Sequence, residues 1–199
     1  MGIHTDSGII PLGSEKSQKE IDLAYLREAY KIAAKYSDDT STQTGAIIVK
    51  DNSVFDIGEE NLLGYGVNSI TRDVKKLPNR KQRPQKYNWI GHSERHAIYD
   101  AARKGNSTQG AIMYMPWFPC VPCADGIIES GIEEIVSHQK AIEWDKEKNY
   151  KSRMNWEDDF EITRKMFEEA NQSRGFSYRF VEGDIGDVEI LFKGKLRKP

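Results

Sequence analysis

The spacing of hydrophobic positions predicts a helix near the start of the chain. Such positions recur every three or four residues, at Ile21, Tyr25, Ala29, Ile32 and Tyr36. This is the period of one helical face. Ser17 followed by Glu20 is a capping-box pattern and marks where the helix begins. Residues 1–18 show no such period, and we expect them to form a loose arm.

Shorter apolar runs predict strands, and helical patterns lie between several of them. The strand candidates are 44–50, 62–68, 111–115, 132–137, 176–182 and 188–193. Further helices are expected over 92–104, from 119 to 131, and around 160–170. Helices that alternate with strands indicate an α/β fold. We therefore expect a single domain over 1–199, built as a three-layer α/β/α sandwich with a central mixed sheet and helices on both faces.

Two segments do not follow either period. Residues 69–91 are basic and contain Pro78 and Pro84, so we expect a functional loop or insertion. Residues 144–159 are polar and aromatic, and we expect a lid-like loop.

Composition narrows the class of protein. Hydrophobic residues make up 38% and charged residues 30% of the chain, with a net charge of −2, which is typical of a globular protein without a nucleic-acid coat. No apolar run approaches the length of a membrane span, and the start of the chain lacks the apolar core of a secretory signal. Two cysteines are too few for a disulfide framework, which favours a reducing, cytoplasmic location.

Charge is concentrated between residues 72 and 86. This stretch contains one acidic residue, Asp73, and seven basic residues: Arg72, Lys75, Lys76, Arg80, Lys81, Arg83 and Lys86. The usual interpretation of such a run is a solvated loop. The alternative is a site for phosphate groups, with Arg72 and Arg83 among its donors.

Two short motifs carry the candidate chemistry. Cys120 and Cys123 lie at i and i+3 on the first turn of a predicted helix, where both thiols point to one side and the helix dipole favours thiolates. His92 begins another predicted helix. If the two helix starts face each other, one imidazole and two thiolates form a three-ligand Zn²⁺ site with a fourth position open for water. Glu94 lies two residues after His92 and would then act as the acid and base that moves the protons of this water.

Other interpretations of these residues stay open. Cys120 and Cys123 could be a redox pair, although no further motif supports this. His96 lies four residues after His92 and could complete a structural Cys₂His₂ site, which would make the protein a non-catalytic zinc-binding module. His4 and His138 receive no role.

The two motifs together resemble the zinc-dependent cytidine deaminase superfamily, and within it the deoxycytidylate deaminases. The resemblance extends over 37–46, 63–68, 113–114 and 118–131. It implies the family fold, zinc on His92, Cys120 and Cys123, proton transfer by Glu94, and contact of Asn68 with the deoxyribose hydroxyl. The implied reaction is the conversion of dCMP to dUMP and ammonia.

The sequence also departs from the family pattern. Ser93 replaces the usual alanine, and His96 stands where asparagine is common. The histidine is also similar to that of the riboflavin-pathway deaminases, but those separate their cysteines more widely. Action on RNA or single-stranded DNA is an alternative, for which the basic run is the candidate groove.

Aromatic residues are candidates for the wall of a base pocket. Trp117 precedes the cysteine motif and Trp156 lies in the expected lid, so both are candidates for substrate binding, with core packing as the alternative. Tyr87 and Trp89 have weaker support.

The resemblance further implies a homo-oligomer, often a hexamer, activated by dCTP with Mg²⁺ and inhibited by dTTP. A regulatory site apart from the zinc pocket could lie in 37–45. Asp39 and Gln43 would supply polar contacts, and Gly45 would let a ligand approach the backbone. A plain helix-to-strand connection is the alternative.

Overall fold

A mixed five-stranded sheet forms the centre of the computed structural model, which describes residues 16–145 and 156–199. The strand order is β2-β1-β5-β6-β7, with bounds Leu62–Val67, Gly45–Val49, Ile112–Met115, Glu134–His138 and Ser177–Val181. β1 is antiparallel to both β2 and β5, whereas β5, β6 and β7 are parallel. The expected mixed sheet is confirmed.

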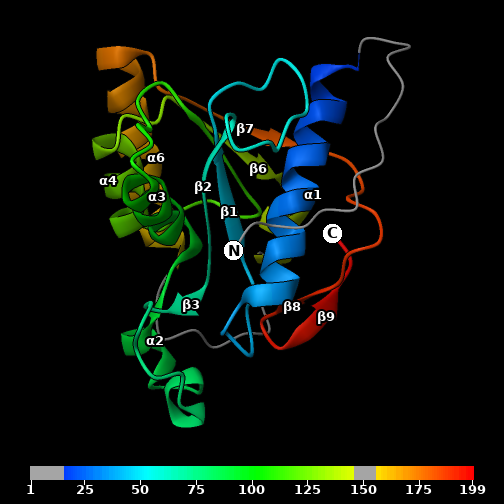
Figure 1. The fold of residues 1–199 in the computed structure, drawn as a ribbon, viewed down its shortest axis with the longest axis vertical. Coiled ribbons are helices and arrows are strands. Elements are labelled where there is room, and N and C mark those ends of the chain that lie inside the picture. Colours follow the sequence, from blue (N-terminus) through cyan, green and yellow to red (C-terminus); the bar gives the residue numbers. More distant parts are fainter. Residues whose placement is uncertain (1–15, 146–155) are drawn as a thin grey trace.

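Helices cover both faces of this sheet (Figure 1). α1 (Gln18–Tyr36) lies on one face, and α3 (Ser93–Lys104), α4 (Val121–Glu129) and α6 (Trp156–Arg174) lie on the other. The alternation along β1 reflects this arrangement. Ile47 and Val49 join the core beneath α1, whereas Ile48 joins the core beneath α3, α4 and α6. The three-layer prediction is therefore correct, and its physical reason is the two-residue period of strand side chains.

The basic segment 69–91 is more ordered than expected. It contains β3 (Ser69–Ile70), the 3₁₀ helix η1 (Pro78–Lys81), α2 (Lys86–Trp89) and β4 (Ile90–Gly91). β3 pairs with β4 in register Ser69↔Gly91 and Ile70↔Ile90. The segment projects from one end of the sheet (Figure 1) and leads directly into α3. The predicted loop or insertion therefore contains short strands and helices of its own.

The C-terminal third also differs from expectation. α5 (Gln139–Asp145) and α6 include both ends of the expected lid, and residues 146–155 between them lie outside the described part. The two predicted final strands belong to different sheets. β7 joins the main sheet, while β8 (Ile190–Phe192) forms a separate hairpin with β9 (Lys195–Arg197).

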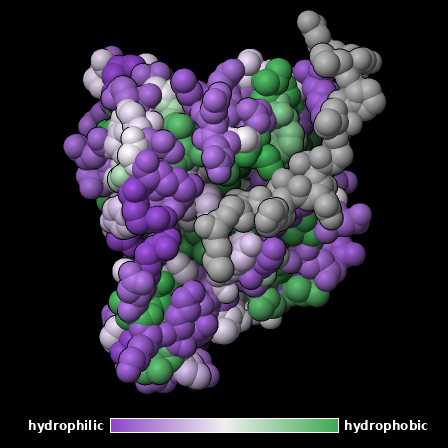
Figure 2. All heavy atoms as spheres, in the orientation of Figure 1, coloured by the Kyte–Doolittle hydropathy of each residue, from purple (hydrophilic) through white to green (hydrophobic). Residues whose placement is uncertain are grey.

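The surface in the orientation of Figure 1 is mostly polar. Figure 2 shows smaller apolar groups near the 69–91 segment and near the β8–β9 hairpin. Within 16–145 and 156–199, no helix combines the length and apolar character that crossing a membrane requires.

Candidate metal and substrate site

The N-terminus of α3 is held close to the sheet. Asn68, which follows β2, accepts a hydrogen bond through Oδ1 from the Ser93 backbone N–H at 3.1 Å. Gly66 on β2 makes the approach possible. A Cβ at Gly66 would lie 2.3 Å from both the Ala97 nitrogen and the Ser93 carbonyl oxygen. Because Gly66 has no side chain, the start of α3 packs directly on the β2 backbone at this point, which positions His92.

His92 and the two cysteines converge at facing helix starts. The Cys120 Sγ lies 3.3 Å from the His92 Nδ1, and the Cys123 Sγ lies 3.5 Å from the same nitrogen. All three ligand atoms lie within 4.8 Å of one another. A tetrahedral zinc ion with ordinary bond lengths would separate a sulfur and a nitrogen ligand by about 3.5 Å. The donor set and its spacing therefore fit Zn²⁺.

Proton affinities in the cluster reflect its close packing. Burial lowers the pKa of His92, but the hydrogen bond with Cys120 and the Glu94 charge outweigh burial, so this pKa is raised overall. The hydrogen bond with Cys123 lowers the pKa of Cys120 to about 6. The same bond, together with burial, raises the pKa of Cys123. One thiol thus ionises readily while the second keeps its proton unless a cation compensates the charge.

His96 is not a member of the cluster. His92 is the N-cap of α3, with the extended backbone angles φ −78° and ψ 152°, so the i,i+4 relation of a helical face does not apply to it. The His96 ring instead packs against Gly91, where a Cβ would lie 2.2 Å from the ring Nε2. This geometry does not support the four-ligand alternative.

Glu94 shares a pocket with the cluster. Its side chain is 7% exposed, and its Oε2 accepts a hydrogen bond from the Ser93 hydroxyl at 3.0 Å. Glu94, His92 and Cys120 all line the pocket. The serine that departs from the family pattern therefore orients the carboxylate.

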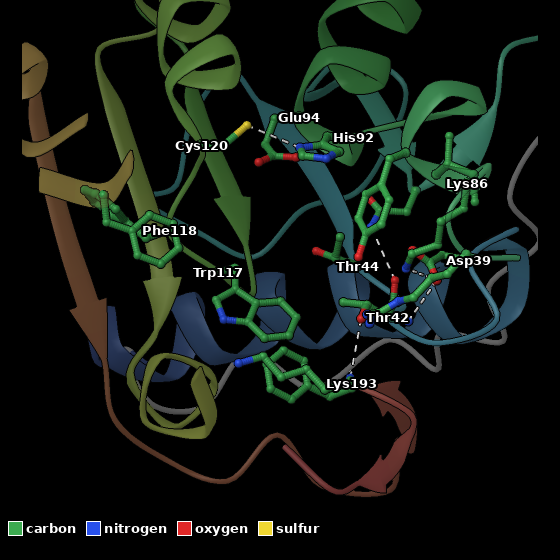
Figure 3. Close-up of a pocket in the computed structure, with 16 residues that line it drawn as sticks. Asp39, Thr42, Thr44, Lys86, His92, Glu94, Trp117, Phe118, Cys120 and Lys193 are labelled. Atoms are coloured by element: carbon green, nitrogen blue, oxygen red, sulfur yellow. Dashed lines mark hydrogen bonds and ion pairs between the residues drawn. The ribbon is translucent and has the colours of Figure 1, made fainter. Parts of the chain in front are cut away.

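The pocket has a volume of about 160 Å³ and joins distant parts of the chain (Figure 3). Asn68 and Trp117, two predicted substrate residues, line it. Trp117 stacks on Phe192 with ring centres 3.8 Å apart and an interplanar angle of 33°. Phe192 and Lys193 come from the C-terminal hairpin, and sequence reasoning missed both.

Residues 19–139 match the family model described as the cytidine and deoxycytidylate deaminase zinc-binding region. The chain belongs to this family.

Several curated deaminases are similar over part of the chain. Human deoxycytidylate deaminase is 33% identical over 118 residues, which span 56% of this chain and 61% of the human protein. The match to the human enzyme therefore covers less than two thirds of its length. An uncharacterized deaminase of Aliivibrio fischeri is 27% identical over 140 residues, spanning 70% of this chain and 82% of that protein.

A solved structure shares the fold. The dCMP deaminase of cyanophage S-TIM5, in complex with dCMP and dUMP, aligns with a TM-score of 0.54 and 18% identity. The alignment covers 82% of this chain and 97% of the phage protein. The likeness supports the three-layer architecture of this deaminase-family chain.

Much of the basic run is paired with acids that sequence reasoning did not connect to it. Lys76 and Lys81 form ion pairs with Asp38 at 2.7 Å and 2.6 Å. Lys86 is buried and pairs with Asp39 at 2.7 Å. These lysines therefore hold the 69–91 segment against the body of the protein instead of forming an extended groove.

Of the remaining predicted substrate residues, some line the pocket and others do not. Arg83 lines the pocket, whereas Arg72 is exposed and is not one of the lining residues. The structure thus does not bring Arg72 to the site. Trp89, one of the weaker candidates, packs under the Arg80 guanidinium, whereas Tyr87 lines the pocket. Trp156 begins α6, and its side chain lies outside the described part.

The residues assigned to a separate regulatory site have other positions. Asp39 lines the pocket that contains Glu94. Gln43 accepts a hydrogen bond from the Leu191 backbone N–H through Oε1 at 2.8 Å. A Cβ at Gly45 would lie 2.3 Å from the Ala29 carbonyl oxygen, so the glycine is required by packing against α1. The described contacts give Gln43 and Gly45 structural roles, and a regulatory site within 37–45 stays a prediction.

Proposed function

We propose that the protein hydrolyses dCMP to dUMP and ammonia, with Zn²⁺ held by His92, Cys120 and Cys123. The observation that carries the proposal is the convergence of these three ligand atoms with the Glu94 carboxylate in one pocket. A structural zinc site would need no such carboxylate. Zinc bound there supplies a Lewis acid that makes a water molecule more acidic.

Glu94 has the position of a proton carrier. It takes a proton from the attacking water and delivers it to N3 of the cytosine while the hydroxide adds to C4. It then takes the proton of the new C4 hydroxyl and delivers it to the amino group. Ammonia leaves, the C4 carbonyl forms, and the sum is dCMP plus water giving dUMP plus ammonia. The Ser93 hydroxyl holds one carboxylate oxygen in place throughout.

The pocket wall suits a cytosine nucleotide. Trp117 and Phe118 offer apolar surface for the base. Asn68 donates one amide hydrogen to the Thr42 carbonyl oxygen at 3.3 Å, and a primary amide has a second hydrogen for a sugar hydroxyl. Arg83 is the predicted basic residue that reaches the pocket, and we assign it to the phosphate.

The decisive experiment follows the ultraviolet change when the protein is incubated separately with dCMP, deoxycytidine, dCTP and a cytosine oligonucleotide, alongside zinc analysis. The proposal predicts bound zinc and preferential turnover of dCMP. Turnover of the oligonucleotide alone would indicate a nucleic-acid deaminase. Bound zinc without turnover of any substrate would indicate a structural zinc module.

Regulation and assembly remain predictions. We propose a homo-oligomer, with a hexamer as the expected form, that dCTP with Mg²⁺ activates and dTTP inhibits. Because a ligand shifts only states that it binds differently, the dCMP rate curve should be sigmoidal, hyperbolic with dCTP, and shifted to higher dCMP by dTTP. Hyperbolic kinetics that neither triphosphate changes would contradict regulation while leaving the deaminase proposal intact.

A further inference from the structure

The C-terminal β8–β9 hairpin forms one wall of the pocket, although it lies outside the family match. That match ends at residue 139, whereas Phe192 and Lys193 line the pocket. Figure 3 shows Lys193 and Trp117 on the side of the pocket opposite His92 and Glu94. Substrate contacts made by the hairpin would therefore be an addition of this chain to the matched region.

The hairpin is fixed to the body of the protein, so its position is defined. The Gln43 backbone N–H donates to the Leu191 carbonyl oxygen at 2.8 Å, and the Gly194 N–H donates to the Ser41 carbonyl oxygen at 2.8 Å. The Lys193 N–H donates to the Thr42 hydroxyl oxygen at 3.4 Å. Residues 41–43 lie just before β1, so these hydrogen bonds connect the hairpin to the start of a strand of the central sheet.

Lys193 occupies an unfavourable backbone conformation at this wall. Phe192 pairs with Lys195, so the turn consists of Lys193 and Gly194, with φ values of 49° and 78°. Two-residue turns with positive φ at both positions favour Asn-Gly or Asp-Gly. A lysine there is strained relative to asparagine, and strained residues cluster at ligand sites.

The Lys193 side chain lies beside the Phe192 ring. Its Nζ lies 5.4 Å from the Phe192 ring centre, and that ring stacks on Trp117. The ammonium group therefore lies beside the aromatic surface that the base would use. A nucleotide with its base directed at Glu94 extends its 5′ end away from the zinc ligands, toward cations at the other end of the pocket.

We propose that Lys193 is a specificity residue that binds the 5′-phosphate from the hairpin wall, together with Arg83 of the 69–91 segment. The inference rests on the proposed function, because it assumes a cytosine nucleotide with its amino group at the zinc site. According to this proposal, the C-terminal hairpin makes the enzyme prefer a nucleotide to a nucleoside. At this position of positive φ, the charge of the lysine suits the site and its backbone preference does not.

The test compares Lys193→Asn, Lys193→Arg and the control Lys195→Asn, which removes a lysine from the same hairpin at an exposed position that does not line the pocket. For each protein, kcat and KM are measured for dCMP and deoxycytidine, together with the melting temperature. Lys193→Asn should raise the KM for dCMP on the order of tenfold, the loss expected for one charge-assisted hydrogen bond, while its melting temperature is equal or higher.

The other two variants complete the design. Lys193→Arg should recover most of the preference for dCMP over deoxycytidine, and Lys195→Asn should behave as the wild type. A wild-type KM for dCMP in Lys193→Asn, or a wild-type protein that uses deoxycytidine as well as dCMP, would overturn the inference and leave the deaminase assignment standing. A wild-type protein inactive on both substrates would overturn the proposed function itself.

Discussion

Gly66 offers the sharpest test of how the fold positions the chemistry. It lies on β2, where a Cβ would be 2.3 Å from two backbone atoms of α3. Ordinary contact begins at 3.4 Å, so Gly66→Ala should force the start of α3 to retreat by about 1 Å, at a cost of about 1–3 kcal/mol in the free energy of unfolding. Because His92 and Glu94 move with the helix start, kcat should fall on the order of 10²-fold.

Two control variants separate positioning from general destabilisation. Gly45→Ala also places a Cβ 2.3 Å from a backbone oxygen, but on α1, which contributes no described residue to the pocket. It should lose comparable stability with a much smaller decrease in kcat. Gly126→Ala lies within α4, with its nearest neighbour at 3.7 Å, and should gain about 0.5–1 kcal/mol from helix propensity.

The measurements are urea unfolding, zinc content and dCMP turnover for all three variants. If Gly66→Ala retains wild-type kcat, or if Gly45→Ala loses as much kcat as Gly66→Ala, the close contact of β2 with α3 does not position the site.

Three further changes test individual residues. Replacing Glu94 with Gln should leave the bound zinc in place and lower kcat on the order of 10²-fold or more, because an amide cannot carry the proton; near-normal turnover would exclude the proton carrier. His96→Ala should retain zinc after dialysis whereas His92→Ala should lose it, and zinc loss from the first variant would restore the four-ligand alternative. Buried His138 donates through Nε2 to a backbone carbonyl and accepts through Nδ1 from Tyr30, and burial lowers its pKa from the ordinary 6.5. The unfolded chain therefore binds a proton more readily, so stability is full above pH 6.5 and declines as the pH falls, by up to about 1.4 kcal/mol per pH unit. Urea unfolding at about pH 7 and about pH 5 should show a smaller decline in His138→Gln than in the wild type, and equal declines would contradict the assignment.

Sequence reasoning was strongest where a short-range pattern has one structural outcome. The apolar run over 44–50 and the capping box at Ser17 and Glu20 both predict local geometry, and the structure contains a strand and a capped helix there. The zinc motif benefits from the same locality. Cys120 and Cys123 are fixed by one helical turn, and only the approach of His92 depends on tertiary packing.

Contacts between distant segments gave no such signal. Nothing in the run from Arg72 to Lys86 indicates that Asp38 and Asp39 pair with its lysines, because a paired lysine and a solvated lysine look identical in sequence. Phe192 and Trp117 are far apart in the sequence, and no hydrophobic period relates them. Gly45 illustrates a further ambiguity, since a glycine required by a helix backbone and one required by a ligand cannot be distinguished without coordinates.

The segment between α1 and β1 connects the two walls of the pocket. Asp38 and Asp39 bind the lysines of the 69–91 wall, whereas Ser41 and Gln43 bind the β8–β9 hairpin. Neither wall belongs to the central sheet, and this segment helps to fix both of them relative to the zinc ligands. A short connection that holds both walls keeps the proposed phosphate contacts, Arg83 and Lys193, at a set distance from each other. The polar residues of 37–43 are thereby explained as the frame of the substrate pocket, which is a structural requirement of the site.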